Sequence, residues 1–93
     1  MTLSQSEILD KIISISKGYG AKRLILFGGY AENSTDAHDI DIACEGIQGW
    51  KLYEFAGRVE NEISFPVDIV SLQPPSDLTR MIEAQGKIIY DNR

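Results

Sequence analysis

The sequence contains a single cysteine, Cys44, among its 93 residues. One cysteine cannot form a disulfide within the chain, and it excludes a zinc site built from several thiolates of one chain. No apolar stretch approaches the roughly 20 residues that a helix needs to cross a bilayer. The first residues, MTLSQSEILD, also lack the basic segment and apolar run of a signal peptide. A cytoplasmic protein without a membrane segment is therefore expected.

Basic residues are in the minority, since 9 Lys and Arg face 14 Asp and Glu and leave a net charge of −5. A protein that binds nucleic acid in general needs clustered basic side chains, so this class is not expected. The length predicts one domain, residues 1–93, with a modest core. Self-association or a partner protein would stabilise so small a domain.

The spacing of apolar residues predicts an α/β fold, a small mixed sheet with helices. A capping box formed by Ser4 and Glu7 begins the first helix, which ends near Gly18. Short apolar or alternating runs predict strands, and stripes of helical period predict two more helices. In chain order after the first helix, we expect a strand at 24–27, a loop or short helix up to residue 38, a strand at 39–44, a helix up to residue 63, a strand at 66–70, a helix between 76 and 86, and a strand at 87–90.

Two acids, Asp39 and Asp41, stand two residues apart on a predicted strand, so their side chains leave the same face, with Cα atoms roughly 7 Å apart. Such a pair alone often consists of solvated acids on an exposed sheet face. Asp68 is a third acid that interrupts an apolar strand, although aspartate is depleted in strands. If the two strands are neighbours, three carboxylates share one surface, where Mg²⁺ would relieve their repulsion. Two such ions can steady the attacking and leaving oxygens of phosphoryl-type transfer.

The first strand runs into Gly28 and Gly29. Glycine lets a backbone approach a phosphate closely, and a helix beginning there would add its free N–H groups. A simple tight turn fits the same two residues. Beside the Asp-x-Asp strand, however, this turn predicts a cradle for a triphosphate that faces a metal site.

The series Phe27-Gly28-Gly29, Asp39-Ile40-Asp41 and Val67-Asp68-Ile69 resembles the minimal nucleotidyltransferase (MNT) domains of the DNA polymerase beta superfamily. The resemblance spans roughly residues 22–90. It implies Mg²⁺-dependent transfer of AMP from ATP, with both metals on Asp39 and Asp41. It further implies that Asp68 binds the catalytic metal and helps to deprotonate the acceptor hydroxyl. Short members of this family are commonly antitoxins of helical HEPN toxins, and some adenylylate a tyrosine of the toxin.

The sequence departs from the family pattern around the glycine turn. Gly29 stands where serine is usual, Glu32 and Asn33 stand where a basic residue and glycine are usual, and His38 replaces a serine. The alternative is therefore an antitoxin of weak or absent activity that neutralises its partner by binding alone. Modification of a small molecule ranks last, because relatives of that kind carry an extra helical domain.

Several other residues invite weaker expectations. Trp50 is expected to anchor a helix start by packing, although an exposed tryptophan would suit an interface. Cys44 is expected in the core. Tyr30 is expected to pack over the glycine turn, with stacking on the base of a nucleotide as the alternative, and His38 is expected to be a surface group, with contact to metal or phosphate as the alternative. Lys22, Arg23, Arg58 and Arg80 are candidates for phosphate contacts, but their spacing selects none of them.

Overall fold

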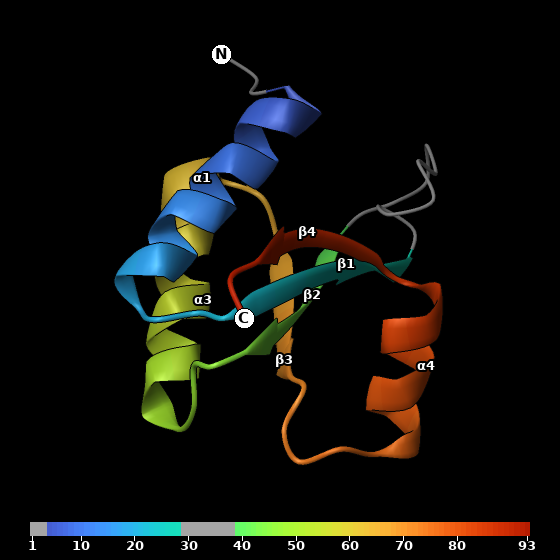
Figure 1. Cartoon of the computed structure of the whole chain (residues 1–93). Coiled ribbons are helices and arrows are strands. Elements are labelled where there is room, and N and C mark those ends of the chain that lie inside the picture. Colours follow the sequence, from blue (N-terminus) through green and yellow to red (C-terminus); the bar gives the residue numbers. More distant parts are fainter. Residues whose placement is uncertain (1–3, 29–38) are drawn as a thin grey trace.

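The computed structural model describes residues 4–28 and 39–93, and it confirms the predicted α/β fold. The described helices and strands follow one another in the predicted order (Figure 1). The short helix or loop predicted before residue 39 lies outside the described residues. The elements are α1 (Gln5–Gly18), β1 (Arg23–Phe27), β2 (Ile40–Glu45), α3 (Trp50–Ile63), β3 (Val67–Ser71), α4 (Asp77–Gln85) and β4 (Lys87–Asp91).

The four strands form one mixed sheet in the order β3-β2-β1-β4. Strand β1 pairs antiparallel with both β2 and β4, whereas β2 and β3 are parallel. The parallel pair requires a crossover, which α3 supplies between β2 and β3. The starts of β2 and β3 therefore lie at the same end of the sheet, where β1 finishes.

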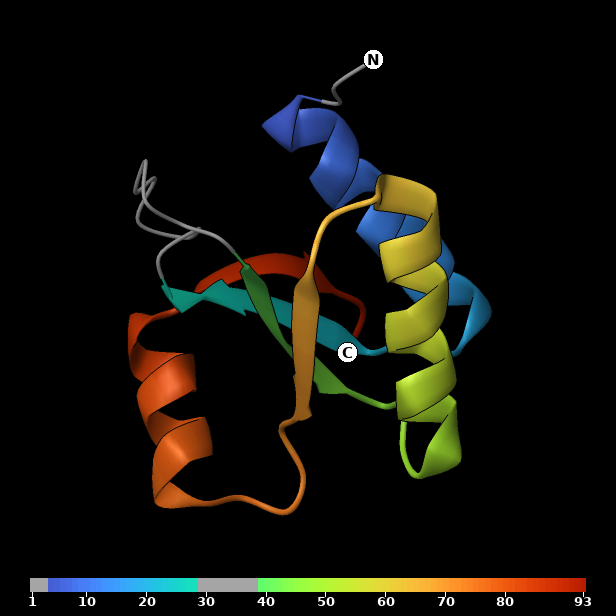
Figure 2. The same cartoon turned by 180° about the vertical axis from the view of Figure 1, so that it is seen from behind.

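Helices cover both faces of the sheet, and each face has its own core. Helices α1 and α3 lie on one side, and α4 lies on the other (Figure 2). The larger core, under α1 and α3, includes Ile12, Ile42 and Phe55, each with no exposed surface. The smaller core, under α4, consists of Ile25, Ala43, Leu72 and Ile82. Because strand side chains alternate between faces, β1, β2 and β3 contribute to both cores, whereas β4 packs Ile89 and Tyr90 against the larger core.

The helix starts follow the sequence signals. Ser4 accepts a hydrogen bond from the backbone N–H of Glu7, whose carboxylate accepts one from the N–H of Ser4, so the predicted capping box forms. Ser76 caps α4 in the same reciprocal way with Thr79. Such caps satisfy N–H groups that have no partner within the helix.

An ion-pair cluster joins α4 to the sheet. The guanidinium of Arg23 on β1 lies 2.9 Å from a carboxylate oxygen of Glu45 on β2 and 3.3 Å from one of Glu83 on α4. The side chain of Arg23 is only 10% exposed. Arg23 thus stabilises the packing of α4 on the sheet, and the expectation that it could contact a phosphate is not supported.

The structure confirms the burial predicted for Cys44 and contradicts the packing predicted for Trp50. Cys44 is fully buried, as predicted, and burial raises the pKa of its thiol to about 11. Trp50 is 69% exposed, so the prediction that it anchors α3 by packing is wrong. It occupies the side of the helix opposite to the buried Phe55 and Val59. Among the described residues, no helix is both long and apolar enough to cross a membrane.

Candidate functional site

The three predicted acids lie at the end of the sheet where β2 and β3 begin. Asp39 immediately precedes β2, Asp41 is its second residue, and Asp68 is the second residue of β3. Asp41 and Asp68 are register partners across the parallel pair. Ile40 and Ile42 are fully buried under α1 and α3, so by alternation Asp41 leaves the opposite face, which also carries Ala43. The structure therefore brings the acids to one end and one face of the sheet.

Asp41 is the central acid of this group. It is half-buried, whereas Asp39 and Asp68 are exposed. Burial raises the pKa of the Asp41 carboxyl above its ordinary value, and the charges of Asp68 and Asp39 raise that pKa further. Both effects disfavour the ionised form, and a cation bound beside Asp41 would oppose both of them.

Gly28 lies against Asp41 at the end of β1. Phe27, the last residue of β1, is the register partner of Asp41. A Cβ atom on Gly28 would overlap with Oδ2 of Asp41 and lie 3.3 Å from its Cγ. Gly28 also has a φ of +76°, a conformation that side chains disfavour. The absence of a side chain at position 28 therefore leaves room for the carboxylate of Asp41.

Several solved structures have the same fold as this chain. A crystal structure of a toxin–antitoxin with AMP-PNP is 24% identical, with a TM-score of 0.77 over 91% of this chain and 74% of the other. A Shewanella oneidensis complex of a tri-AMPylated HEPN toxin with an MNT antitoxin is 24% identical, with a TM-score of 0.75 over 95% and 73%. The MntA-HepT toxin–antitoxin is 24% identical, with a TM-score of 0.73 over 94% and 73%. The chain has the MNT antitoxin fold. The sequence matches no protein-family model and no curated protein.

The acids of this MNT fold suit a hard cation by chemistry, because Mg²⁺ prefers carboxylate oxygens. In the described part of the chain, no three acidic, histidine or cysteine side chains converge closely enough to hold a metal ion by themselves. Mg²⁺ usually takes only one or two carboxylates and completes its shell with substrate phosphates and water. The half-buried Asp41 with Asp68 beside it therefore fits a site that the phosphates of a nucleotide help to complete.

Other residues of the predicted cradle lie outside the described residues. Gly29, Tyr30, Glu32, Asn33 and His38 belong to this group, so their expected roles stay predictions. Phe27 belongs to the motif that carries the resemblance, but the sequence assigned it no role of its own. In the structure it is partly buried and is the register partner of Asp41.

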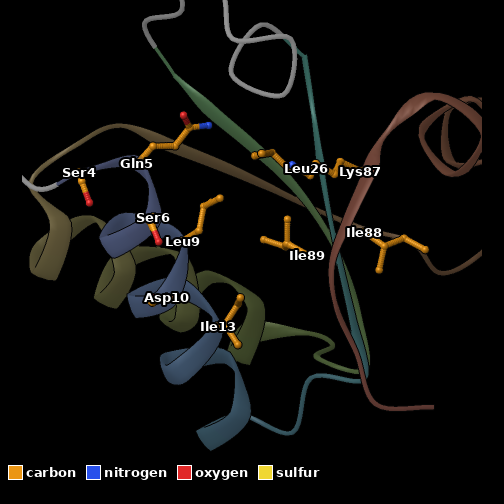
Figure 3. A pocket seen from close by; sticks show the side chains of 10 residues that line it. All are labelled: Ser4, Gln5, Ser6, Leu9, Asp10, Ile13, Leu26, Lys87, Ile88 and Ile89. Atoms are coloured by element: carbon orange, nitrogen blue, oxygen red, sulfur yellow. The ribbon is translucent and has the colours of Figure 1, made fainter.

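A groove of about 660 Å³ lies elsewhere in the MNT fold, between the first half of α1 and β4 (Figure 3). Its apolar wall includes Leu9, Ile13 and Leu26, which belong to or pack against the core under α1 and α3. None of the three acids lines it. The groove is thus on the opposite face of the sheet from Asp41, and we do not assign the predicted chemistry to it.

The candidate basic residues are mostly engaged elsewhere. Arg58 pairs with Glu62 along α3 at 3.2 Å, and Arg80 pairs with Asp77 along α4 at 3.0 Å. Arg23 is held by Glu45 and Glu83. The sequence could not reveal these pairings, because the pair partners of Arg23 lie 22 and 60 residues away.

Proposed function

We propose that this chain is a Mg²⁺-dependent nucleotidyltransferase that transfers AMP from ATP to a hydroxyl group. The proposed acceptor is a tyrosine of a HEPN toxin, which makes the chain the antitoxin of a toxin–antitoxin pair. The observation that carries the proposal is the register pairing of Asp41 with Asp68, with Asp39 alongside and Gly28 against the Asp41 carboxylate.

Each residue has a role in this proposal. Asp39 and Asp41 would hold both Mg²⁺ ions, Asp68 would bind the catalytic ion, and the backbone at Gly28 and Gly29 would approach the phosphates. When bound, Mg²⁺ would neutralise charge on the triphosphate and on the acids. The acceptor oxygen attacks the α-phosphorus, the bond to the β-phosphate oxygen breaks, and pyrophosphate leaves with the electron pair. Asp68 helps to take the proton of the acceptor hydroxyl, for which its exposed position on β3 leaves access.

The solved structures of similar fold support the choice of acceptor and nucleotide. One of them holds AMP-PNP, an analogue of ATP. Another contains a HEPN toxin that carries three AMP groups together with its MNT antitoxin. We extend both relationships to this chain because it has the same fold and carries three acids and a glycine at one end of its sheet.

The test uses ATP labelled at the α-phosphate, Mg²⁺ and the purified HEPN protein encoded beside this chain. We expect label on a tyrosine of the partner, and a partner mass increased by whole AMP groups. Asp41→Asn and Asp68→Asn should abolish the transfer, whereas Asp10→Asn, an exposed acid on α1, should not. Label that never reaches the partner, with the acid variants still neutralising it, would exclude the enzyme.

The second candidate is an antitoxin that neutralises its partner by binding alone. Two residues favour it: Gly29 removes a hydroxyl usual in the family, and Glu32 would repel a triphosphate that it faced. In that case, neutralisation should need a stoichiometric amount of antitoxin and no ATP. The enzymatic antitoxin should instead act at substoichiometric amounts.

A further inference from the structure

The outer face of α3 carries an exposed stripe that nothing in the described chain covers. Trp50, Tyr53 and Gly57 form this stripe, at positions i, i+3 and i+7 of the helix, and therefore lie along one side. Trp50 is 69% exposed and Tyr53 is 82% exposed. The buried side of the helix, with Phe55 and Val59, points the other way, into the larger core. Two large aromatic side chains are thus presented to solvent on a helix that already has a complete packing face.

Nothing in the described part of the chain requires a glycine at position 57. It lies in the interior of a 14-residue helix, where glycine is a poor helix former. A Cβ atom there would meet no atom within 4 Å, and its φ is not positive. Neither crowding nor backbone conformation therefore requires glycine at this position. A glycine on an exposed helix face does, however, let another helix approach closely beside the two aromatic rings.

The charges around the stripe indicate what kind of helix would fit. Glu54 lies beside Trp50 on the exposed side, and Glu60 lies beside Gly57, where its carboxylate also accepts a hydrogen bond from the N–H of Val67. Of the nearby basic residues, Lys51 follows Trp50 on the side toward Glu54, and Arg58 is already paired with Glu62. Acidic side chains thus border the stripe in a chain whose net charge is −5. A partner helix with basic residues beside its apolar contacts would be complementary.

The size of the stripe is consistent with the centre of a protein interface. Tryptophan and tyrosine each bury about 150–250 Å² when fully covered. At their present exposure, Trp50 and Tyr53 would contribute on the order of 300 Å² of the roughly 800 Å² that each partner gives to a standard interface. Tryptophan and tyrosine are also the residues that most often dominate binding energy. Exposed neighbours along α3 would form the rim.

We propose that the stripe of Trp50, Tyr53 and Gly57 receives an amphipathic helix of the partner toxin, bordered by basic residues. This inference rests on the proposed function for the identity of the partner. The stripe belongs to the helix layer on one face of the sheet, whereas Asp41 leaves the other face. Holding the partner and modifying it therefore use separate surfaces of this chain.

The test measures the affinity of the purified full chain for the purified HEPN protein by titration calorimetry. The double variant Trp50→Ala/Tyr53→Ala should raise Kd about thirty-fold or more. A matched control is Leu78→Ala/Met81→Ala, which removes two apolar side chains of α4 that are each 51% exposed. This control should change Kd less than threefold. An unchanged Kd in the aromatic variant, or an equal loss in the control, would overturn the assignment.

A second variant separates binding from folding. Gly57→Ala adds a methyl group where the free chain has room, so it should raise Tm by about 4–8 °C because alanine favours helix. The same methyl group should weaken partner binding at least fivefold by holding the two helices apart. If Gly57→Ala binds as tightly as the original chain, the close approach is wrong. If the free chain is a dimer that Gly57→Ala dissociates, a second copy is the occupant and the proposal falls.

Parallel measurement of AMP transfer distinguishes this inference from the proposed function. Asp41→Asn should bind the partner with unchanged Kd but transfer no label. Loss of binding in the aromatic variant, with no transfer by the original chain, would remove the enzyme and leave the docking stripe. If the original chain transfers AMP and the aromatic variant transfers it equally well, the enzyme stands and the docking stripe is wrong. If the original chain does not bind the partner, both are wrong.

Discussion

Asp41 and Asp68 stand side by side as register partners on two parallel strands, with their side chains on the same face of the sheet. Neighbouring strands lie about 4.8 Å apart, so two carboxylates in this arrangement repel each other. Asp41 is also half-buried, and the pKa of its carboxyl is raised by burial and by both neighbouring acids. The free protein therefore keeps a repulsive cluster that a bound cation would relieve, which is a common arrangement at functional sites.

Removal of one acid should stabilise the protein when metal is absent. Asp68→Asn takes away a charge that raises the Asp41 pKa. In EDTA we therefore expect the free energy of unfolding to rise by roughly 0.5–1 kcal/mol. In Mg²⁺ the order should reverse, because the variant loses cation binding. Urea unfolding in both buffers measures this, with Asp10→Asn on α1 as a control that leaves the cluster intact. A destabilised Asp68→Asn protein in EDTA would contradict the repulsion.

The raised pKa of Asp41 also predicts how stability changes with pH. A carboxyl whose pKa is higher in the folded state than in the unfolded state stabilises the fold at low pH, and this contribution is lost as pH rises through the folded pKa. In EDTA, the protein with Asp41 should therefore lose stability relative to Asp41→Asn as pH rises above about 4. The difference in unfolding free energy between the two proteins, measured from pH 3.5 to 7, checks this. A difference that moves in the other direction would mean that Asp41 is favourably paired.

Most of the fold was predictable because local signals agreed with the final arrangement. The capping residues Ser4 and Ser76 mark the starts of two helices as expected, and the alternation of Ile40, Asp41 and Ile42 places apolar and acidic side chains on opposite faces. The sequence could also predict that Asp68 leaves the core. It could not establish that β2 and β3 are neighbours, because register depends on contacts between distant segments.

The sequence predictions failed at residues whose surroundings are formed by segments that are distant in the chain. Trp50 lies at the start of α3, outside the stripe of apolar residues that predicts the buried side of this helix. Its large apolar side chain nevertheless made burial the natural expectation. The structure instead leaves it in solvent. The ion pairs of Arg23 with Glu45 and Glu83 are equally invisible in sequence, because they form only after β1, β2 and α4 come together.

Gly28→Ala should damage the site directly. The new methyl group would overlap with Oδ2 of Asp41, and alanine disfavours the φ of +76° at this position. We expect Kd for ATP in the presence of Mg²⁺ to rise at least tenfold, with a loss of roughly 1–2 kcal/mol in stability. Gly18→Ala is the matched control, because a Cβ there meets nothing within 4 Å and its φ is not positive. Unchanged nucleotide binding in Gly28→Ala would separate this glycine from the site.

Arg23 should prove structural and not a phosphate ligand. Arg23→Ala leaves the mostly buried carboxylate of Glu45 without its partner and releases α4 from the sheet, so we expect a loss of about 2 kcal/mol. The exposed pair of Arg58 with Glu62 serves as the control, and Arg58→Ala should cost no more than about 0.5 kcal/mol. Denaturation with parallel ATP titration tests both. Weaker ATP binding by Arg23→Ala at unchanged stability would reverse the assignment.

Titration of the chain with AMP-PNP, with and without Mg²⁺, shows whether the paired acids bind a metal–nucleotide complex. We expect binding that requires Mg²⁺, that weakens at least tenfold in Asp41→Asn and in Asp68→Asn, and that is unchanged in Asp10→Asn. Binding of equal strength in EDTA, equal binding by the three variants, or no heat of binding at all in Mg²⁺ would show that the paired acids do not hold a metal–nucleotide complex.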